Sequence, residues 1–219
     1  HMANLCIMGS HNVNGVSELH SDILKKSVFK DFYDDTPEKF TNVTNGIAHR
    51  RWLCQSNPGL AGLLDETIGS SYKKNGPDLI KLLAFQNDNT ILDKLAEIKN
   101  ANKKNFAELL LHESGIKLNP DSIFDVQVKR LHEYKRQLLN ALQIIALYLD
   151  LKENPGLDIV PQTYLFAAKA APGYDRAKSI IRLIVNLGEE IAKDPVISKK
   201  LQVVFLENYS CLLYTSTSP

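Results

Sequence analysis

The second half of the chain has a hydrophobic pattern that switches between two periods. Residues 124–128 alternate apolar and polar side chains, as in a strand, whereas the runs 164–168 and 201–206 are mostly apolar. Between these runs, apolar residues recur every three or four positions, which predicts helices over 131–149 and 177–191. The order β-α-β-α-β predicts an α/β fold with a parallel sheet covered on both faces. Ligands of such sheets lie beyond the carboxyl ends of the strands.

The earlier part of the chain, from residue 3 to about residue 115, has mostly helical spacing. Apolar residues recur at intervals of three and four over 16–28, 60–68 and 91–98, and each stretch predicts a helix. Gly115 follows the last of these stretches and is expected to end its helix, because glycine is common just past a helix C-terminus.

The segment 40–47 separates the first two predicted helices and is rich in threonine and asparagine. Its Asn45-Gly46 pair is a turn signal, and its polar composition is typical of an exposed connection. We therefore expect a hinge between two domains near this segment.

Composition excludes several classes of protein and leaves the α/β reading intact. An apolar share of 44% can supply a core, and 26 Lys and Arg against 25 Asp and Glu give a net charge of +1. This balance does not favour a nucleic acid or an acidic membrane surface as partner. Three widely separated cysteines favour a reducing compartment over a disulfide framework or a zinc site.

The densest charged cluster lies in residues 129–136, directly after the first predicted strand of the sheet. A helix is expected to begin at once there, and cations in a first helical turn are disfavoured by about 0.3–1 kcal/mol each. Their presence would make sense if they bound an anion together with free backbone N–H groups. The alternative is a solvated basic face with Lys129 and Glu133 as an ordinary i,i+4 pair. Spacing leaves both open. The basic side chains of the cluster are Lys129, Arg130, His132, Lys135 and Arg136.

Two other features carry weaker signals. The small residues of 167–174, with Gly173 among them, suit a backbone that approaches a ligand closely, but they also suit a plain strand-to-helix connection. Trp52, the only tryptophan, is either a core residue or a platform for a ligand. Neither a glycine-rich dinucleotide motif nor a P-loop is present, and the six histidines show no metal-ligand spacing.

Several longer segments, in matching order and spacing, resemble the α-glucan phosphorylases, the family that acts on glycogen, starch and maltodextrins. The resemblance covers residues 2 to about 209, which is nearly the whole chain. The segments that carry it are Gly9–Gly15, Phe40–Ile47, Arg50–Trp52, Val128–Gln137, Lys169–Tyr174 and Glu207–Tyr209.

The resemblance implies a partial GT-B-like glycosyltransferase, in which two Rossmann-like domains face each other across a cleft. Residues 1–46 would be the last part of the first domain, and 47–209 the opening half of the second, cofactor-binding domain. Residues 210–219 would be an unmatched tail. The implied reaction cleaves terminal α-1,4-linked glucose from a glucan with inorganic phosphate and gives glucose 1-phosphate with retained configuration. The implied cofactor is pyridoxal phosphate, acting through its 5′-phosphate.

By position, the resemblance also assigns roles to individual residues. The residues that would grip the substrate phosphate are Arg130 and Lys135. The residues at the cofactor would be Lys129 at its phosphate, Tyr209 nearby and Trp52 at the border of its pocket. The residues that would bind the sugar are Asn45 at the 6-hydroxyl and Tyr134 at the 2-hydroxyl.

The sequence also departs from the family pattern. The family's glycine-rich motif with the cofactor lysine follows the segment that ends at Tyr209, and it does not occur in this sequence. We therefore expect an internal fragment that is inactive alone, from a cytoplasmic, homodimeric parent of an allosteric enzyme family. No nucleic acid and no membrane is expected as partner. A non-catalytic α/β module that binds an anion or a sugar is the alternative.

Overall fold

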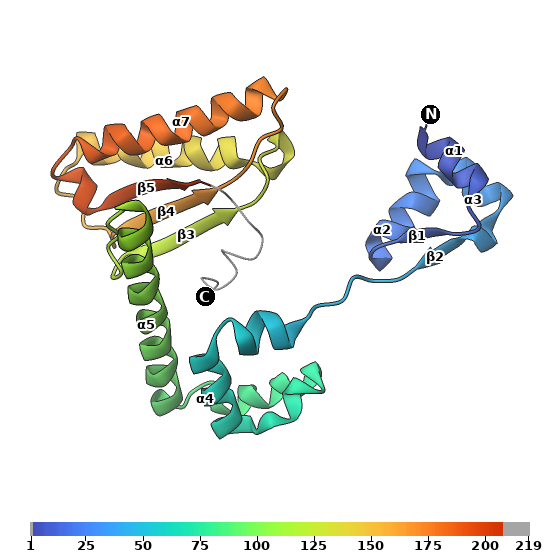
Figure 1. Ribbon diagram of the computed structural model, residues 1–219, viewed down its shortest axis with the longest axis horizontal. Coiled ribbons are helices and arrows are strands. Elements are labelled where there is room, and N and C mark those ends of the chain that lie inside the picture. The colour runs from blue at the N-terminus through green and yellow to red at the C-terminus, as the bar shows by residue number, and fades with distance from the viewer. Residues whose placement is uncertain (1, 208–219) are drawn as a thin grey trace. The chain divides into compact units, whose positions relative to one another are not determined.

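The computed structural model describes residues 2–207, which belong to two compact units. One unit comprises the residues up to His49, and the other comprises the residues from Arg50 onward. Figure 1 shows the elements of both units.

The first unit is built around a short parallel pair of strands. Strand β1 pairs with β2, with Val13 opposite Phe40. Gly15 is required in β1 because a Cβ there would lie 2.0 Å from Ser21 Oγ. The elements of this unit are α1 (Met2–Gly9), β1 (Val13–Gly15), α2 (Glu18–Ile23), a π-helical turn (Leu24–Val28), α3 (Lys30–Asp35), a 3-10 turn (Pro37–Lys39) and β2 (Phe40–Asn42).

The helix predicted over 16–28 is only partly correct. Val16 lies outside it, and the helix begins at Glu18 because the Ser17 side chain accepts a hydrogen bond from the backbone N–H of His20. The two short strands were not predicted, because three residues are too few to show a period. Residues 43–48 are exposed and have no regular structure, as predicted, but Asn45-Gly46 forms no turn.

The helical part of the second unit follows the predicted stretches closely. Asn57 caps α4 (Pro58–Ile68), and Asp88 caps α5 (Asn89–Ser114) by accepting hydrogen bonds from backbone N–H groups of the first turn. Gly115 ends α5 in the left-handed conformation, with φ 67°, as the sequence predicts. The other helical segments are a π-helical one (Arg50–Gln55) and two 3-10 ones (Ser70–Lys73 and Gly76–Phe85).

The rest of the second unit is the predicted β-α-β-α-β fold. Its three strands are all parallel and stand in the order β3-β4-β5. At their carboxyl ends, Val128, Ala167 and Leu206 lie in register. The elements are β3 (Ile123–Val128), a 3-10 turn (Glu133–Lys135), α6 (Gln137–Glu153), β4 (Gln162–Ala167), α7 (Asp175–Ala192), a 3-10 turn (Ile197–Lys199) and β5 (Leu201–Leu206).

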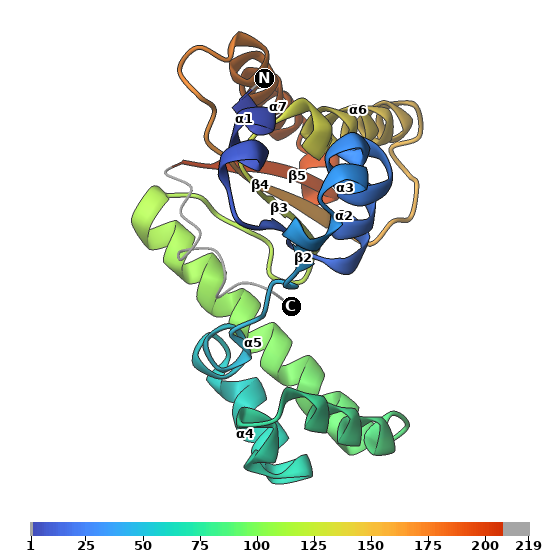
Figure 2. The same ribbon diagram turned by 90° about the vertical axis from the view of Figure 1, so that its right-hand side faces the viewer.

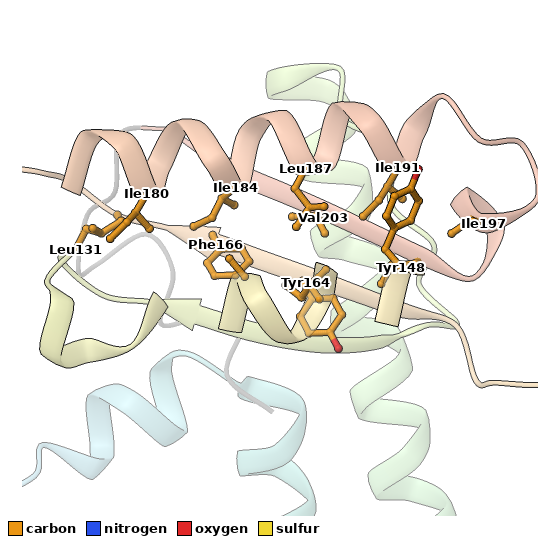
Figure 3. Packing of buried hydrophobic residues seen from close by; sticks show 14 of the residues in the cluster. Leu131, Tyr148, Tyr164, Phe166, Ile180, Ile184, Leu187, Ile191, Ile197 and Val203 are labelled. Atoms are coloured by element: carbon orange, nitrogen blue, oxygen red, sulfur yellow. The ribbon is translucent and has the colours of Figure 1, made fainter. Parts of the chain in front are cut away.

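Two apolar clusters cover the faces of β4 and β5, as expected, whereas Ile123, Asp125 and Val126 of the edge strand β3 are exposed. Helices α6 and α7 pack on one face, where Tyr164 and Phe166 of β4 are buried (Figure 3). On the other face, Leu165 and Ala167 pack against a cluster that includes Leu110, from the last turns of α5. Figure 2 shows α5 as one long helix, and only its C-terminal end lies against the sheet. Because these clusters fill the faces of the two strands, a ligand of this unit is expected beyond the carboxyl ends of the strands.

Candidate functional site

The basic segment 129–136 is a loop and not the start of a helix. Helix α6 begins at Gln137, and Arg136 before it has a left-handed backbone with φ 65°. The prediction that these cations lie in a first helical turn is therefore wrong, and so is the dipole penalty attached to them. The cause is Arg136 itself, because a left-handed residue cannot continue a right-handed helix.

This loop extends the carboxyl end of the sheet. The backbone N–H of Lys129 donates to the carbonyl oxygen of Ala167 (3.1 Å), and the N–H of Leu131 donates to that of Lys169 (3.2 Å). The Leu131 side chain is 2% exposed and belongs to the core cluster under α6 and α7. The loop is thus anchored by one buried side chain and two main-chain hydrogen bonds, while its charged residues stay at the surface.

The four Lys and Arg side chains of the loop have no ionic partner among the described residues. Within residues 2–207, none of them forms a hydrogen bond or an ion pair, and the Lys135 ammonium lies 5.7 Å from the centre of the Tyr134 ring. Four like charges in eight residues repel one another unless an anion lies near them. The arrangement can therefore bind a multiply charged anion such as a phosphate. These side chains are Lys129, Arg130, Lys135 and Arg136.

The single acid of the loop, Glu133, is bound to the segment that follows β4, at Tyr174 of the connecting loop and at Arg176 in the first turn of α7. Its carboxylate accepts hydrogen bonds from Tyr174 Oη (2.7 Å) and from the Arg176 guanidinium (2.8 Å). The i,i+4 pair with Lys129, which belonged to the alternative of a solvated basic face, does not form. The hydrogen bond from Tyr174, and then that from Arg176, lower the pKa of Glu133, and the same contact with Glu133 raises the pKa of Tyr174. Glu133 thus links the loops that follow β3 and β4.

Sequence reasoning missed this bridge. Tyr174 and Arg176 lie 41 and 43 residues from Glu133 along the chain, so no helical or strand spacing connects them. The only usable signal is topological. Loops that follow neighbouring parallel strands meet at one edge of the sheet, so 129–136 and 167–174 are expected to be close.

Aromatic rings form a small surface cluster beside the cations. The His132 ring stacks on Tyr134 at 5.1 Å between centroids and lies 5.8 Å from the Tyr174 ring. Tyr134 is 74% exposed, so its hydroxyl is available to a ligand. A phenol beside fixed cations can bind a sugar hydroxyl without adding charge.

The other predicted site residues lie elsewhere. Asn45 is an exposed residue of the first unit, and its backbone N–H donates to the carbonyl oxygen of Val16 (3.0 Å). Trp52 is half-buried in the segment Arg50–Gln55, where the Arg51 guanidinium lies 5.1 Å from its ring. Tyr209 lies outside the described residues. The structure therefore gathers Lys129, Arg130, Tyr134 and Lys135 on one loop and does not join Trp52 to them by any described contact.

A cavity of about 400 Å³ lies between α4, α5 and the start of β3. Its lining is mainly apolar, and the ammonium of Lys103 beside it donates to the carbonyl oxygen of Ser122 (2.6 Å). The basic loop contributes no residue to its lining. Among residues 2–207, no group of acidic, cysteine or histidine side chains could hold a metal ion, and no helix is long and apolar enough to cross a membrane.

Comparison with known proteins gives one consistent result. The model of the carbohydrate phosphorylase family matches residues 1–218. The chain is 50% identical over 218 residues to the muscle form of glycogen phosphorylase from Oryctolagus cuniculus and 51% identical to the liver form from Homo sapiens. In both comparisons the match covers 100% of this chain and 26% of the relative. The chain thus spans about a quarter of the length of these relatives.

Proposed function

Because this chain belongs to the carbohydrate phosphorylase family, we propose that the longer protein containing it is an α-1,4-glucan phosphorylase. It would transfer terminal glucose from a glucan to inorganic phosphate and give glucose 1-phosphate with retained configuration. The observation that carries this proposal is the basic loop at the carboxyl end of the sheet, with four cations that no described side chain neutralises. A cytoplasmic homodimer is proposed on the family resemblance.

The loop has the chemistry that binding of inorganic phosphate requires. Arg130 offers planar N–H donors that can bind a phosphate with two hydrogen bonds, and Lys135 offers a mobile point charge. Both side chains lie on one loop, and neither forms an ion pair with any residue from 2 to 207. We assign these two residues to the substrate phosphate, where they would stabilise the charge that accumulates as the glycosidic bond breaks.

The glucose unit would be recognised by neutral groups. We assign Tyr134 to the 2-hydroxyl, since its phenol is exposed beside the cations, and Asn45 to the 6-hydroxyl. The residues up to Gly46 would be the last part of the first domain of the parent, and 47–209 the opening half of its second domain.

Pyridoxal phosphate is proposed as the cofactor, and Lys129 fits it. Its ammonium is exposed at the end of β3 and has no partner in residues 2–207, so it can balance a second phosphate. When bound, the cofactor would supply its 5′-phosphate as a proton-donating partner of the substrate phosphate. Trp52 is proposed to border this group, and Tyr209 to lie near it. The attachment lysine would come from outside this chain, so the chain alone is expected to release no glucose 1-phosphate.

Kinetics of the full-length protein test the proposal. Arg130→Ala and Lys135→Ala remove charged partners of a phosphate, which costs roughly 2–5 kcal/mol, or about 30- to several-thousand-fold in rate. Asn45→Ala removes neutral hydrogen bonds and should cost less, about 1–3 kcal/mol. Each variant is assayed with glucose 1-phosphate and with its 6-deoxy analogue. Asn45→Ala should shrink the preference for the normal sugar, whereas Arg130→Ala should lower both rates and keep that preference.

Arg182→Ala is the matched control, because Arg182 is an exposed cation of α7 outside the loop. It should leave phosphate use unchanged. If Arg130→Ala and Lys135→Ala also leave phosphate use unchanged, the loop is a solvated basic face and the assignment is wrong. The alternative of a non-catalytic anion- or sugar-binding module predicts binding without release of glucose 1-phosphate by the full-length protein.

A further inference from the structure

Two main-chain carbonyl groups of the basic loop are held by side-chain amides. Gln137 Nε2 donates to the carbonyl oxygen of Arg130 (3.3 Å), and Gln127 Nε2 donates to that of Lys135 (3.1 Å). The residues whose backbone is held in this way are the two assigned to the substrate phosphate. The side chains that hold them come from β3 and from the first turn of α6, which are regular elements on either side of the loop.

A third amide, that of Asn140, fixes Gln127 in place. Asn140 Nδ2 donates to Gln127 Oε1 (3.0 Å), so Gln127 is bound at both ends of its amide. The backbone N–H of Asn140 also donates to the carbonyl oxygen of Arg136 (3.1 Å), where α6 begins. We call Gln127, Gln137 and Asn140 the amide bracket. It joins the two ends of the loop to the strand before it and the helix after it.

The burial and hydrogen bonding of Gln137 indicate that its side-chain NH₂ group is the part that contributes to the structure. Its side chain is 1% exposed, and its Oε1 has no hydrogen-bond partner among residues 2–207. Turning the amide over would place Oε1 against the Arg130 carbonyl oxygen, which is an acceptor too, so the NH₂ group must face the loop. An apolar side chain would avoid the unsatisfied acceptor. What the amide provides and an apolar side chain would not is the hydrogen bond to the Arg130 carbonyl oxygen.

The bracket adds to the anchors at Leu131 and Glu133 in a segment whose composition opposes a single conformation. Its four cations repel one another, and Arg136 has the unfavourable left-handed backbone. The bracket also turns the carbonyl oxygen of Arg130 toward the buried amide of Gln137 and that of Lys135 toward the half-buried amide of Gln127. Carbonyl oxygens directed at a phosphate would repel it, whereas a loop fixed with these groups turned inward keeps its donors ready for the anion.

We propose that Gln127, Gln137 and Asn140 are positioning residues that preorganise the loop 129–136 for inorganic phosphate. They do not touch the anion, and they act through the backbone of Arg130 and Lys135. The proposal rests on the proposed function for the identity of the ligand, and on the hydrogen bonds above for the role of the bracket.

The test uses the full-length protein with Gln137→Met and Gln127→Met, which keep the length of the side chain and remove the donor. We expect kcat/KM for inorganic phosphate to fall about ten- to a hundredfold, because small misplacements of a binding group have effects of this size. KM for the glucan should be unchanged. The melting temperature of Gln137→Met should fall little compared with its kcat/KM for phosphate. The reason is that this variant also removes the buried unpaired acceptor, Gln137 Oε1.

Gln202→Met is the matched control. Gln202 of β5 makes the same kind of bond, from its Nε2 to the carbonyl oxygen of Lys117 (2.8 Å), outside the basic loop. Its loss should leave phosphate kinetics unchanged. Gln127→Glu gives a second readout, because a protonated glutamate can still donate to the Lys135 carbonyl and an ionised one cannot. Its phosphate kinetics should approach those of the natural protein as pH falls, whereas those of Gln127→Met should show no such recovery.

The outcomes separate the two proposals. Normal phosphate kinetics in both bracket variants, with impaired kinetics in Arg130→Ala, would overturn the bracket and leave the proposed function standing. Normal kinetics in Arg130→Ala and Lys135→Ala would overturn both. A general loss of stability with equal effects on phosphate and glucan would show that the amides are merely structural. If Gln137→Met does not fold, Gln127→Met decides, because Gln127 is only half-buried.

Discussion

Gly188 lies where α7 packs against β5, and its replacement should distinguish close packing from helix propensity. A Cβ built on Gly188 would lie 2.5 Å from the carbonyl oxygen of Val203 and 3.4 Å from its carbonyl carbon. These atoms belong to the backbone of β5, which is held by its hydrogen bonds to β4. They cannot rotate away as the end of a flexible side chain can. The helix or the strand must therefore move when Gly188 becomes alanine.

The expected size of the effect is the difference between two opposing terms. Alanine in place of glycine in a helix gains about 1 kcal/mol. Overfilling a packed interface costs about 1–3 kcal/mol, and a rigid backbone obstacle places Gly188→Ala at the upper end of that range. The net loss in the free energy of unfolding should be about 2 kcal/mol. Gly62→Ala in α4 has nothing within 4 Å of the new methyl group, so only the gain of about 1 kcal/mol should appear there.

The assay is urea unfolding followed by far-ultraviolet circular dichroism, with the two variants compared with the natural sequence. Their midpoints should move in opposite directions, and their stabilities should differ by about 3 kcal/mol. If Gly188→Ala is as stable as Gly62→Ala, the close approach of α7 to β5 does not constrain this position and the reasoning is refuted.

Two further perturbations test the caps and the loop bridge. Asp88→Ala should lower the free energy of unfolding by about 1 kcal/mol in the same assay, because the Asp88 carboxylate accepts from two backbone N–H groups of the first turn of α5; no loss would show that solvent replaces the cap. The contacts with Tyr174 and Arg176 lower the pKa of Glu133, so its bridge is fully present above the usual pKa of 4.5 and is lost as pH falls through the lowered value. We therefore compare the hydrogen-exchange rates of the backbone amides of 129–136 in the natural protein and in Glu133→Gln at the same pH. The rate in the natural protein, relative to that in the variant, should rise as pH falls. Equal rates in both proteins at every pH would contradict this.

The sequence predicts the second unit well because its elements are long and periodic. The three strands and α7 show an alternating, continuously apolar or helical pattern over five or more residues, and the structure has them within two residues of where the pattern places them. Gly115 was readable as the end of α5 because a left-handed residue after a helix favours glycine. Where the period is short, as in β1 and β2, the pattern carries no signal.

The start of α6 could not be predicted, for a physical reason. Leu131 and Tyr134 extend the helical spacing of the following residues backward, so hydrophobic period alone continues the helix through the loop. In the structure Leu131 is buried as a single anchor, and Tyr134 is exposed. The break occurs at Arg136, whose residue type gives no hint of a left-handed backbone. Only tertiary contacts, such as the bond from Gln127 to the Lys135 carbonyl, select this conformation.

The position of the charges, before α6 instead of within it, also changes what they can do. In a helix, residues three or four positions apart share a face, whereas Arg130 and Lys135 are five positions apart. Helical spacing alone would therefore not aim both side chains at one small anion. In a loop fixed at Leu131, at the Glu133 bridge and by the amide bracket, each side chain has its own direction. A loop of this kind costs stability through charge repulsion and a left-handed residue. This loss of stability is offset if the loop binds the anion. An anion that binds only the folded state raises the free energy of unfolding once its concentration exceeds its dissociation constant.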